Sequence, residues 1–246
     1  MQLPDARAPR LFIDEPLTGG AELTLGRDQT HYLVNVMRRE AGEAALLFNG
    51  RDGEWAAVIG EIGRRSAQLT VTEQLRPQAA PQDIRYCFAP LKRARLDFIA
   101  QKATELGAAA LQPVVTRYTV ATRVNMDRLR ANAVEAAEQC GVLWVPDVAE
   151  PMPLERCLAE RDNARLLIFC DEGAPLANPI AALSAAAPGP LDVLIGPEGG
   201  FTEEERAAVK SCDKVLALSL GPRIMRADTA GIAALSLVQA VLGDWA

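Results

Sequence analysis

The sequence predicts an α/β protein in which a small β-barrel precedes a larger α/β domain. Two observations predict this division of the 246 residues. Residues 1–75 contain short strand patterns separated by turn signals such as Gly19-Gly20 and Asn49-Gly50. From Ile84 onward, apolar runs alternate with amphipathic helical segments, which is typical of parallel strands joined by crossover helices.

In the N-terminal domain, each predicted strand lies between turn residues. The predicted strands are 10–14, 21–25, 43–50, 54–62 and 66–75, and residues 28–38 form a predicted helix. The stretch RPQAAPQ at 76–82 then combines two prolines with polar and small residues, so we place a linker there.

The C-terminal domain, residues 83–246, continues with alternating strands and helices. Strands are predicted at 84–91, 110–116, 164–172, 191–198 and 214–221, and helices at 95–106, 127–140, near Ile180, at 202–211 and at 229–242. Ligands of such domains bind at the carboxyl ends of the strands. We therefore expect the functional residues in the loops that follow them.

Composition excludes several classes of protein. The N-terminus lacks the apolar core of a signal peptide and no apolar run reaches membrane-spanning length, so a cytoplasmic protein is expected. The five cysteines are widely spaced and indicate neither a disulfide framework nor a metal site. A net charge of -6 argues against indiscriminate nucleic-acid binding, although a local basic face remains compatible with it.

Two glycine turns follow predicted strands, LIGPEGG at 194–200 and LSLGPRIMRADTAG at 218–231. Glycine lets backbone groups approach a ligand, and neither turn has the Lys-Ser/Thr ending of a phosphate loop. Thr202 and Glu205 form a capping box, and the acids at 203–205 disfavour a phosphate at that helix start. A neutral or cationic ligand such as S-adenosylmethionine fits better; the alternative is two loops that only turn the chain.

Four ordered motifs carry a resemblance over nearly the whole chain: QKATELG at 101–107, EAAEQC at 135–140, LIGPEGGF at 194–201 and LGPRIMRADTA at 220–230. With them the chain resembles the ribosomal RNA small subunit methyltransferase E family of the SPOUT superfamily. The resemblance implies a PUA-like RNA-binding barrel at 1–75 and a SPOUT methyltransferase domain at 83–246 with a deep trefoil knot.

The same resemblance implies a homodimer that uses S-adenosylmethionine to methylate N3 of a uridine in the decoding region of 16S rRNA, within the small ribosomal subunit. One alternative is a non-catalytic RNA-binding or ribosome-assembly protein with the same fold. A nucleotide-dependent enzyme unrelated to methylation is a second alternative, which the missing phosphate-binding signatures disfavour.

Carried over by motif, the cofactor pocket comes from the two glycine turns. Its expected residues are Leu194, Gly196, Pro197, Glu198, Gly199, Gly200, Leu218, Leu220, Gly221, Ile224, Met225, Arg226, Thr229 and Ala230. For the apolar members, plain core packing is the alternative. Valine at Gly196 or Gly221 is expected to abolish cofactor binding and leave the fold intact.

Arg226 is the candidate catalytic residue, because a cation there could stabilise the developing anion. Anchoring a phosphate of the target nucleotide is its alternative role. The sequence identifies no general base, although Glu198 and Asp228 are candidates. The chain departs from the family pattern at Val142, where an arginine is usual, and at Ala227 and Asp228 of the RADTA motif.

A local basic face must supply RNA affinity in an acidic protein. The candidates are Arg7, Arg10, Arg38, Arg39, Lys92 and Arg93. A solvated surface of an arginine-rich chain is the alternative. Packing or RNA contact, rather than catalysis, is expected for His31, and helix or subunit contacts for Glu105, Glu135, Glu138 and Gln139.

Overall fold

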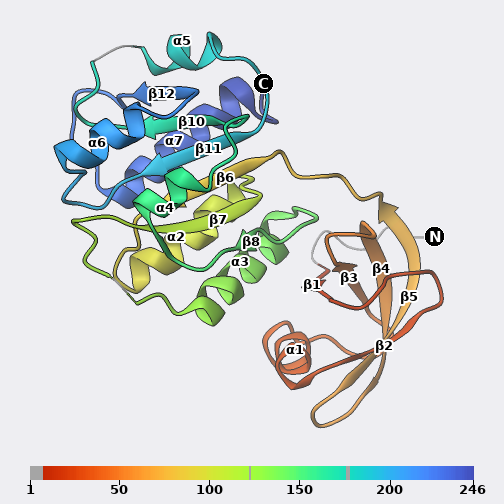
Figure 1. Ribbon diagram of the computed structural model, residues 1–246. Coiled ribbons are helices and arrows are strands. Elements are labelled where there is room, and N and C mark those ends of the chain that lie inside the picture. Colours follow the sequence, from red (N-terminus) through yellow and green to blue (C-terminus); the bar gives the residue numbers. More distant parts are fainter. Residues whose placement is uncertain (1–7, 122, 176–177) are drawn as a thin grey trace. The chain divides into compact units, whose positions relative to one another are not determined.

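The computed structural model describes residues 8–121, 123–175 and 178–246, and the chain divides into two compact units (Figure 1). Unit 1 comprises Met1–Ala80 together with Ala137–Val145, and unit 2 comprises Pro81–Ala136 and Pro146–Ala246. The sequence predicts residues 137–145 to belong to the C-terminal domain, whereas by their contacts they group with the N-terminal strands in unit 1. Within the described residues, no helix is long and apolar enough to cross a membrane.

Unit 1 is built on a five-stranded sheet of order β1-β3-β4-β5-β2. Its strands are β1 Arg10–Phe12, β2 Glu22–Leu25, β3 Ala44–Phe48, β4 Glu54–Ile62 and β5 Ala67–Arg76. β1 pairs with β3 in parallel, and the other ladders are antiparallel. Among the described residues the ladders leave β1 and β2 at the two ends of the sheet, so a closed barrel stays a prediction.

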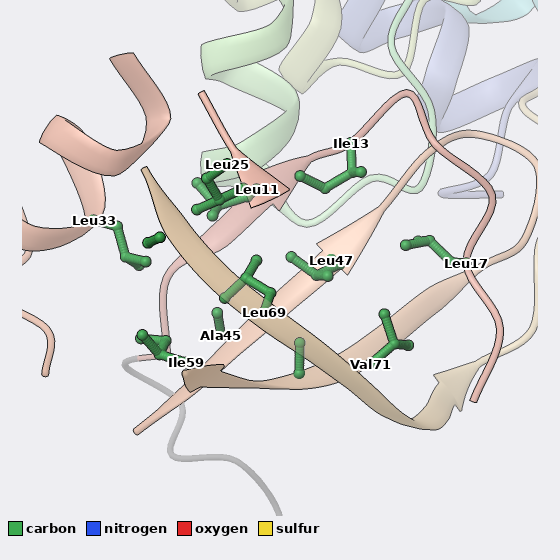
Figure 2. Packing of buried hydrophobic residues seen from close by; sticks show 12 residues of the cluster. Leu11, Ile13, Leu17, Leu25, Leu33, Ala45, Leu47, Ile59, Leu69 and Val71 are labelled. Atoms are coloured by element: carbon green, nitrogen blue, oxygen red, sulfur yellow. The ribbon is translucent and has the colours of Figure 1, made fainter. Parts of the chain in front are cut away.

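One face of this sheet is buried. Along β5, Ala67, Leu69 and Val71 are buried while the residues between them are exposed, as the two-residue period of a strand requires. Helix α1, Arg27–His31, continues into the π-helix η1, Tyr32–Val36, and Leu33 reaches from there toward the strands (Figure 2). The resulting core contains leucines from several strands, including Leu47.

A buried ion-pair network ties residues 137–145 into unit 1. Arg10 Nε donates to Glu54 Oε1 at 2.7 Å, and its Nη atoms donate to the carbonyls of Ala137 at 2.6 Å and Val142 at 2.9 Å. Arg76 donates to Glu54 Oε2 at 2.8 Å. Burial tends to raise the pKa of Glu54, but the hydrogen bonds from both arginines outweigh it, and the pKa is lowered.

Apolar packing holds the same segment. Ala137 and Leu143 are buried against Phe48, and Val142 and Trp144 pack on this cluster. This packing explains why the segment belongs to unit 1 although its first four residues are the last turn of a helix that begins in unit 2. The periodicity of that helix, α3 Met126–Cys140, predicts its ends well but contains no information on which unit its last turn contacts.

Unit 2 contains a parallel sheet of order β12-β10-β11-β6-β7-β8, with β9 paired to β7 (Figure 1). The strands are β6 Ile84–Phe88, β7 Ala110–Val115, β8 Asp147–Val148, β9 Met152–Pro153, β10 Leu166–Cys170, β11 Leu191–Ile195 and β12 Val215–Leu218. The central strand β11 is buried at every position, which is typical of a parallel strand covered on both faces.

The remaining helices are α2 Ala94–Glu105, α4 Leu154–Ala159, α5 Pro179–Ser184, α6 Glu203–Lys210 and α7 Ala227–Leu242. The predicted capping box is confirmed, since the Thr202 hydroxyl accepts from Glu205 N and the Glu205 carboxylate accepts from Thr202 N. The sequence analysis missed α4, β8 and β9, because elements of two to six residues carry too little periodicity to be recognised.

Candidate functional site

A cavity of about 370 Å³ lies at the carboxyl ends of three adjacent strands of unit 2, β10, β11 and β12. Three segments line it: the end of β10, the loop after β11 and the loop after β12, joined by the start of α7. The carboxyl edge of a parallel sheet is where ligands of this fold class bind. Because the two predicted glycine turns are both in its wall, the cavity is the candidate site.

The loop after β11 is compact because its far end is packed into the core. Gly200 has a φ of +70°, and its N–H donates to Pro197 O at 3.0 Å. Phe201 is buried and meets Phe169 edge to face, with ring centroids 5.0 Å apart. The capped start of α6 follows at once. The backbone of Gly196 to Gly200 is therefore fixed along the cavity wall.

The loop after β12 is more exposed. Gly221 has a φ of +108°, and a Cβ atom built there would meet no atom within 4 Å. Ile224 lines the cavity yet is 92% exposed. Helix α7 then begins, with Ala227 and Ala230 in the cavity wall. A substrate or cofactor entering here would find an apolar surface that no described side chain covers.

Acidic residues from β10 form another part of the wall. The Asp171 carboxylate is fully buried, and Lys210 of α6 approaches its Oδ2 at 2.8 Å. Arg206 of α6 pairs with both Asp171 and Glu172, and its Nε donates to Phe201 O at 3.3 Å. These contacts hold α6 and the first glycine loop against the end of β10.

Cys170 is a neutral part of the same wall. Burial raises the pKa of this thiol to about 12, so the thiolate that acts as a nucleophile is scarce at neutral pH. Among the residues that the structure describes, no cluster of three or more His, Cys, Asp or Glu side chains could hold a metal ion.

Arg95, on the first turn of α2, connects the two glycine loops. Its Nη1 lies 2.9 Å from Glu198 Oε1 in the first loop, and its Nε lies 3.8 Å from Asp228 Oδ2 at the start of α7. Asp228 therefore still reaches a cation despite being shorter than the glutamate usual at this position. Both acids that the sequence analysis considered as a base are held by the same guanidinium.

Comparison with known families gives two matches along the chain. A family model described as an RNA methyltransferase domain matches residues 78–239, and an RNA methyltransferase PUA domain matches residues 25–72. The ribosomal RNA small subunit methyltransferase E of Rickettsia conorii is 30% identical over 94% of this chain and 94% of its own. The chain belongs to the ribosomal RNA small subunit methyltransferase E family. The enzyme of that name from Synechocystis is 32% identical over 90% of this chain and 74% of its own.

Solved structures agree with this family. The methyltransferase E of Neisseria gonorrhoeae, bound to S-adenosylmethionine, has a TM-score of 0.85 at 26% identity and covers 97% of this chain and 100% of its own. A methyltransferase of Legionella pneumophila, also with bound S-adenosylmethionine, has a TM-score of 0.84 at 28% identity over 96% and 98% of the two chains. The predicted α/β class and PUA-like domain are thereby confirmed.

Most cofactor residues predicted from the family motifs come together in the cavity wall. They are Gly196, Pro197, Glu198, Gly199, Gly200, Leu218, Leu220, Gly221, Ile224, Met225 and Ala230. Leu194, Arg226 and Thr229 are not in this wall. Leu194 packs in the core instead, because successive side chains of a strand point to opposite faces and its neighbour Ile195 takes the cavity face.

Of the two remaining residues outside the cavity wall, Thr229 is placed there by the period of helix α7. Ala227 and Ala230 are three residues apart and share the cavity face of α7, whereas Thr229 is exposed on another face. Arg226 is exposed at the N-cap of α7. Its catalytic role stays a prediction, which requires substrate to reach it from outside the cavity.

Sequence reasoning missed several residues of the wall, namely Cys170, Asp171, Glu172, Ile195, Ser219, Pro222, Arg223 and Ala227. The signal for the first three was present in CDE at 170–172, at the carboxyl end of a predicted strand. Strand order was the missing information, since β10 lies between β11 and β12 in the sheet although it precedes both in the chain.

The predicted RNA-binding residues come from both units. Arg7 lies outside the described residues, and Lys92 and Arg93 are exposed in unit 2, whereas Arg38 is exposed in unit 1. Arg39 pairs with Glu43 at 3.2 Å.

The structure does not favour the prediction for Arg10, because its side chain is only 11% exposed and its donors serve Glu54 and backbone carbonyls. Glu138 is expected to make structural contacts, and its carboxylate accepts a hydrogen bond from Phe12 N at 2.9 Å. Val142 lies in the same region: its backbone carbonyl accepts a hydrogen bond from Arg10, and its side chain packs on the apolar cluster around Phe48.

Proposed function

We propose that this chain transfers a methyl group from S-adenosylmethionine to N3 of a uridine in the decoding region of 16S rRNA. The observation that carries the proposal is the cavity built from two glycine loops at the carboxyl ends of β11 and β12. Relatives with the same fold hold S-adenosylmethionine, and the family acts on small-subunit rRNA.

The residues present fit this cofactor. The cavity has the size of a small-molecule site, and glycine backbone groups lie beside the apolar side chains of Ile195, Leu218 and Met225. The acids Glu172 and Glu198 also line it, which suits a cation better than a phosphate. When bound, S-adenosylmethionine supplies an electrophilic methyl group on a positively charged sulfur.

The chain's own residues then have two tasks. They position the uracil ring in line with the reactive group, which removes most of the entropic barrier. They also accept the N3 proton, and the candidate acceptors are Glu198 of the cavity wall and Asp228 at the start of α7, both oriented by Arg95. Arg226 would stabilise the uracil anion or hold a phosphate of the same nucleotide.

Two features of the family complete the proposal. A trefoil knot in unit 2 would fix the glycine loops in place, and the PUA-like unit 1, as a barrel, would bind the RNA. Arg223, in the loop after β12, also lines the cavity and adds a positive charge to its wall.

Binding and transfer are tested together. Calorimetry should show S-adenosylmethionine and its demethylated product binding to the purified protein, and radiolabelled methyl should pass to 16S rRNA or small subunits from a strain that lacks the gene. Mapping the modified nucleotide should locate N3-methyluridine in the decoding region. Binding without transfer to any RNA substrate would instead support a non-catalytic assembly protein.

A homodimer through unit 2 is the second part of the proposal. Helix α7 is apolar on nearly all sides, and Ile232, Leu237 and Val241 are only partly buried in the single chain. Such a face is stabilised by a partner. Light scattering should give twice the 26.4 kDa chain mass, and a fully active monomer at micromolar concentration would contradict the dimer.

A further inference from the structure

A second groove lies in unit 1, far along the sequence from the cofactor cavity. Its wall comes from α1, from η1 and from the tip of the β4–β5 hairpin. Arg27, His31 and Asn35 line it from the helical side, and Arg64 and Arg65 from the hairpin. Of these five residues, only His31 is one for which the sequence predicts packing or RNA contact.

The hairpin geometry explains why two arginines reach this groove. Gly63 N donates to Ser66 O at 2.8 Å, which closes a tight turn with Arg64 and Arg65 as its central residues. Both are exposed, and so is Arg27, which begins α1 directly after β2.

Among the described residues of unit 1, these three arginines and Arg38 form no ion pair, whereas the remaining arginines do. Among the described residues, Arg10, Arg39, Arg51 and Arg76 each pair with a carboxylate. Within the same limits, no carboxylate lies within ion-pair distance of Arg27, Arg64 or Arg65, although the exposed Asp28 also lines the groove. The groove therefore has a net positive charge in a chain whose net charge is -6.

The chemistry of the groove suits a nucleic-acid backbone. Guanidinium groups bind phosphate oxygens with two parallel hydrogen bonds. Asn35 Nδ2 and His31 Nδ1 are 2.8 Å apart, and the remaining polar atoms of this pair can serve ribose or base groups. The π-helix that carries Val34 and Asn35 is a rare conformation that occurs often at functional sites.

We propose that this groove binds the phosphodiester backbone of the RNA substrate, with Arg27, Arg64 and Arg65 as its phosphate ligands. The inference rests on the proposed RNA methyltransferase function and names the surface by which unit 1 holds its substrate. It replaces Arg10 and Arg39, whose guanidinium groups already serve carboxylates of the protein.

The test measures binding of a 16S rRNA transcript across a salt series. Arg64→Ala/Arg65→Ala should weaken binding at least about tenfold at low salt and flatten the slope of log affinity against log salt by roughly two units, one for each phosphate contact. Arg27→Ala should flatten it by roughly one. The KM for RNA should rise while kcat and the affinity for S-adenosylmethionine stay unchanged.

A matched control removes two arginines that already have carboxylate partners. Arg51 pairs with Asp14 and Arg156 with Glu160, and both are exposed, so Arg51→Ala/Arg156→Ala lowers the net charge by the same amount. The proposal that this groove binds RNA would be overturned if Arg64→Ala/Arg65→Ala kept the wild-type affinity and slope. It would also be overturned if the control variant lost as much RNA affinity. Failure of the proposed function is a separate result, because the unsubstituted protein would then bind no cofactor or transfer no methyl.

Discussion

Valine in place of Gly221 is expected to weaken binding of S-adenosylmethionine at least about 100-fold, or about 2.7 kcal/mol. Gly221 lines the cavity, and a Cβ there meets no protein atom within 4 Å, so the new side chain would occupy cavity space. Its φ of +108° also disfavours a branched residue, which costs on the order of 1–3 kcal/mol of stability.

Gly42→Val is the matched control for this strain. Gly42 has a φ of +91° and equally open surroundings, but it lies in unit 1. It should lose similar stability and keep full cofactor affinity, measured by calorimetry beside thermal unfolding. Unchanged affinity in Gly221→Val would remove the loop after β12 from the cofactor site.

For Gly196→Val, the structure does not support the expectation that the fold stays intact. A Cβ there would lie 2.5 Å from Cε2 of Phe201, whose ring packs in the core against Phe169. Valine at Gly196 therefore displaces a core side chain and is expected to destabilise the fold as well as the site. Of the two glycine substitutions, Gly221→Val is therefore the one that tests cofactor binding without displacing a core side chain.

Asp192→Ala is expected to lower the free energy of unfolding by about 3–5 kcal/mol, because it leaves the buried Arg161 and the partly buried Arg85 without a carboxylate partner. Asp192 is 1% exposed in the central strand β11. Its carboxylate accepts from Arg85 Nη2 at 2.7 Å and from Arg165 Nε at 2.6 Å, and Arg161 Nε lies 3.8 Å away. Urea unfolding of the variant beside the wild-type protein measures the loss of stability.

Two further variants sharpen this experiment. Asp192→Asn keeps the shape and some of the hydrogen bonds, so it should fold and show a smaller loss if the alanine variant does not fold. Glu160→Ala removes the acid of an exposed ion pair with Arg156 and should change stability little. An unfolding midpoint of Asp192→Ala equal to the wild type would show that the arginines find other partners or water.

Local features of this protein are predictable from its amino-acid sequence. The strand and helix order, the capped start of α6 and the two glycine turns could be predicted because each depends on residues a few positions apart. The family motifs added the predicted cofactor residues of those turns, and most of these residues line one cavity.

Which distant segments meet is visible only in the folded chain. The place of β10 between β11 and β12 adds Asp171 and Glu172 to the cavity, and the packing of residues 137–145 makes Arg10 a buried ion-pair partner instead of a surface cation. The unpaired arginines at the β4–β5 turn became recognisable in the same way. Strand order, burial and charge pairing depend on contacts between residues tens of positions apart, and no local pattern encodes those contacts.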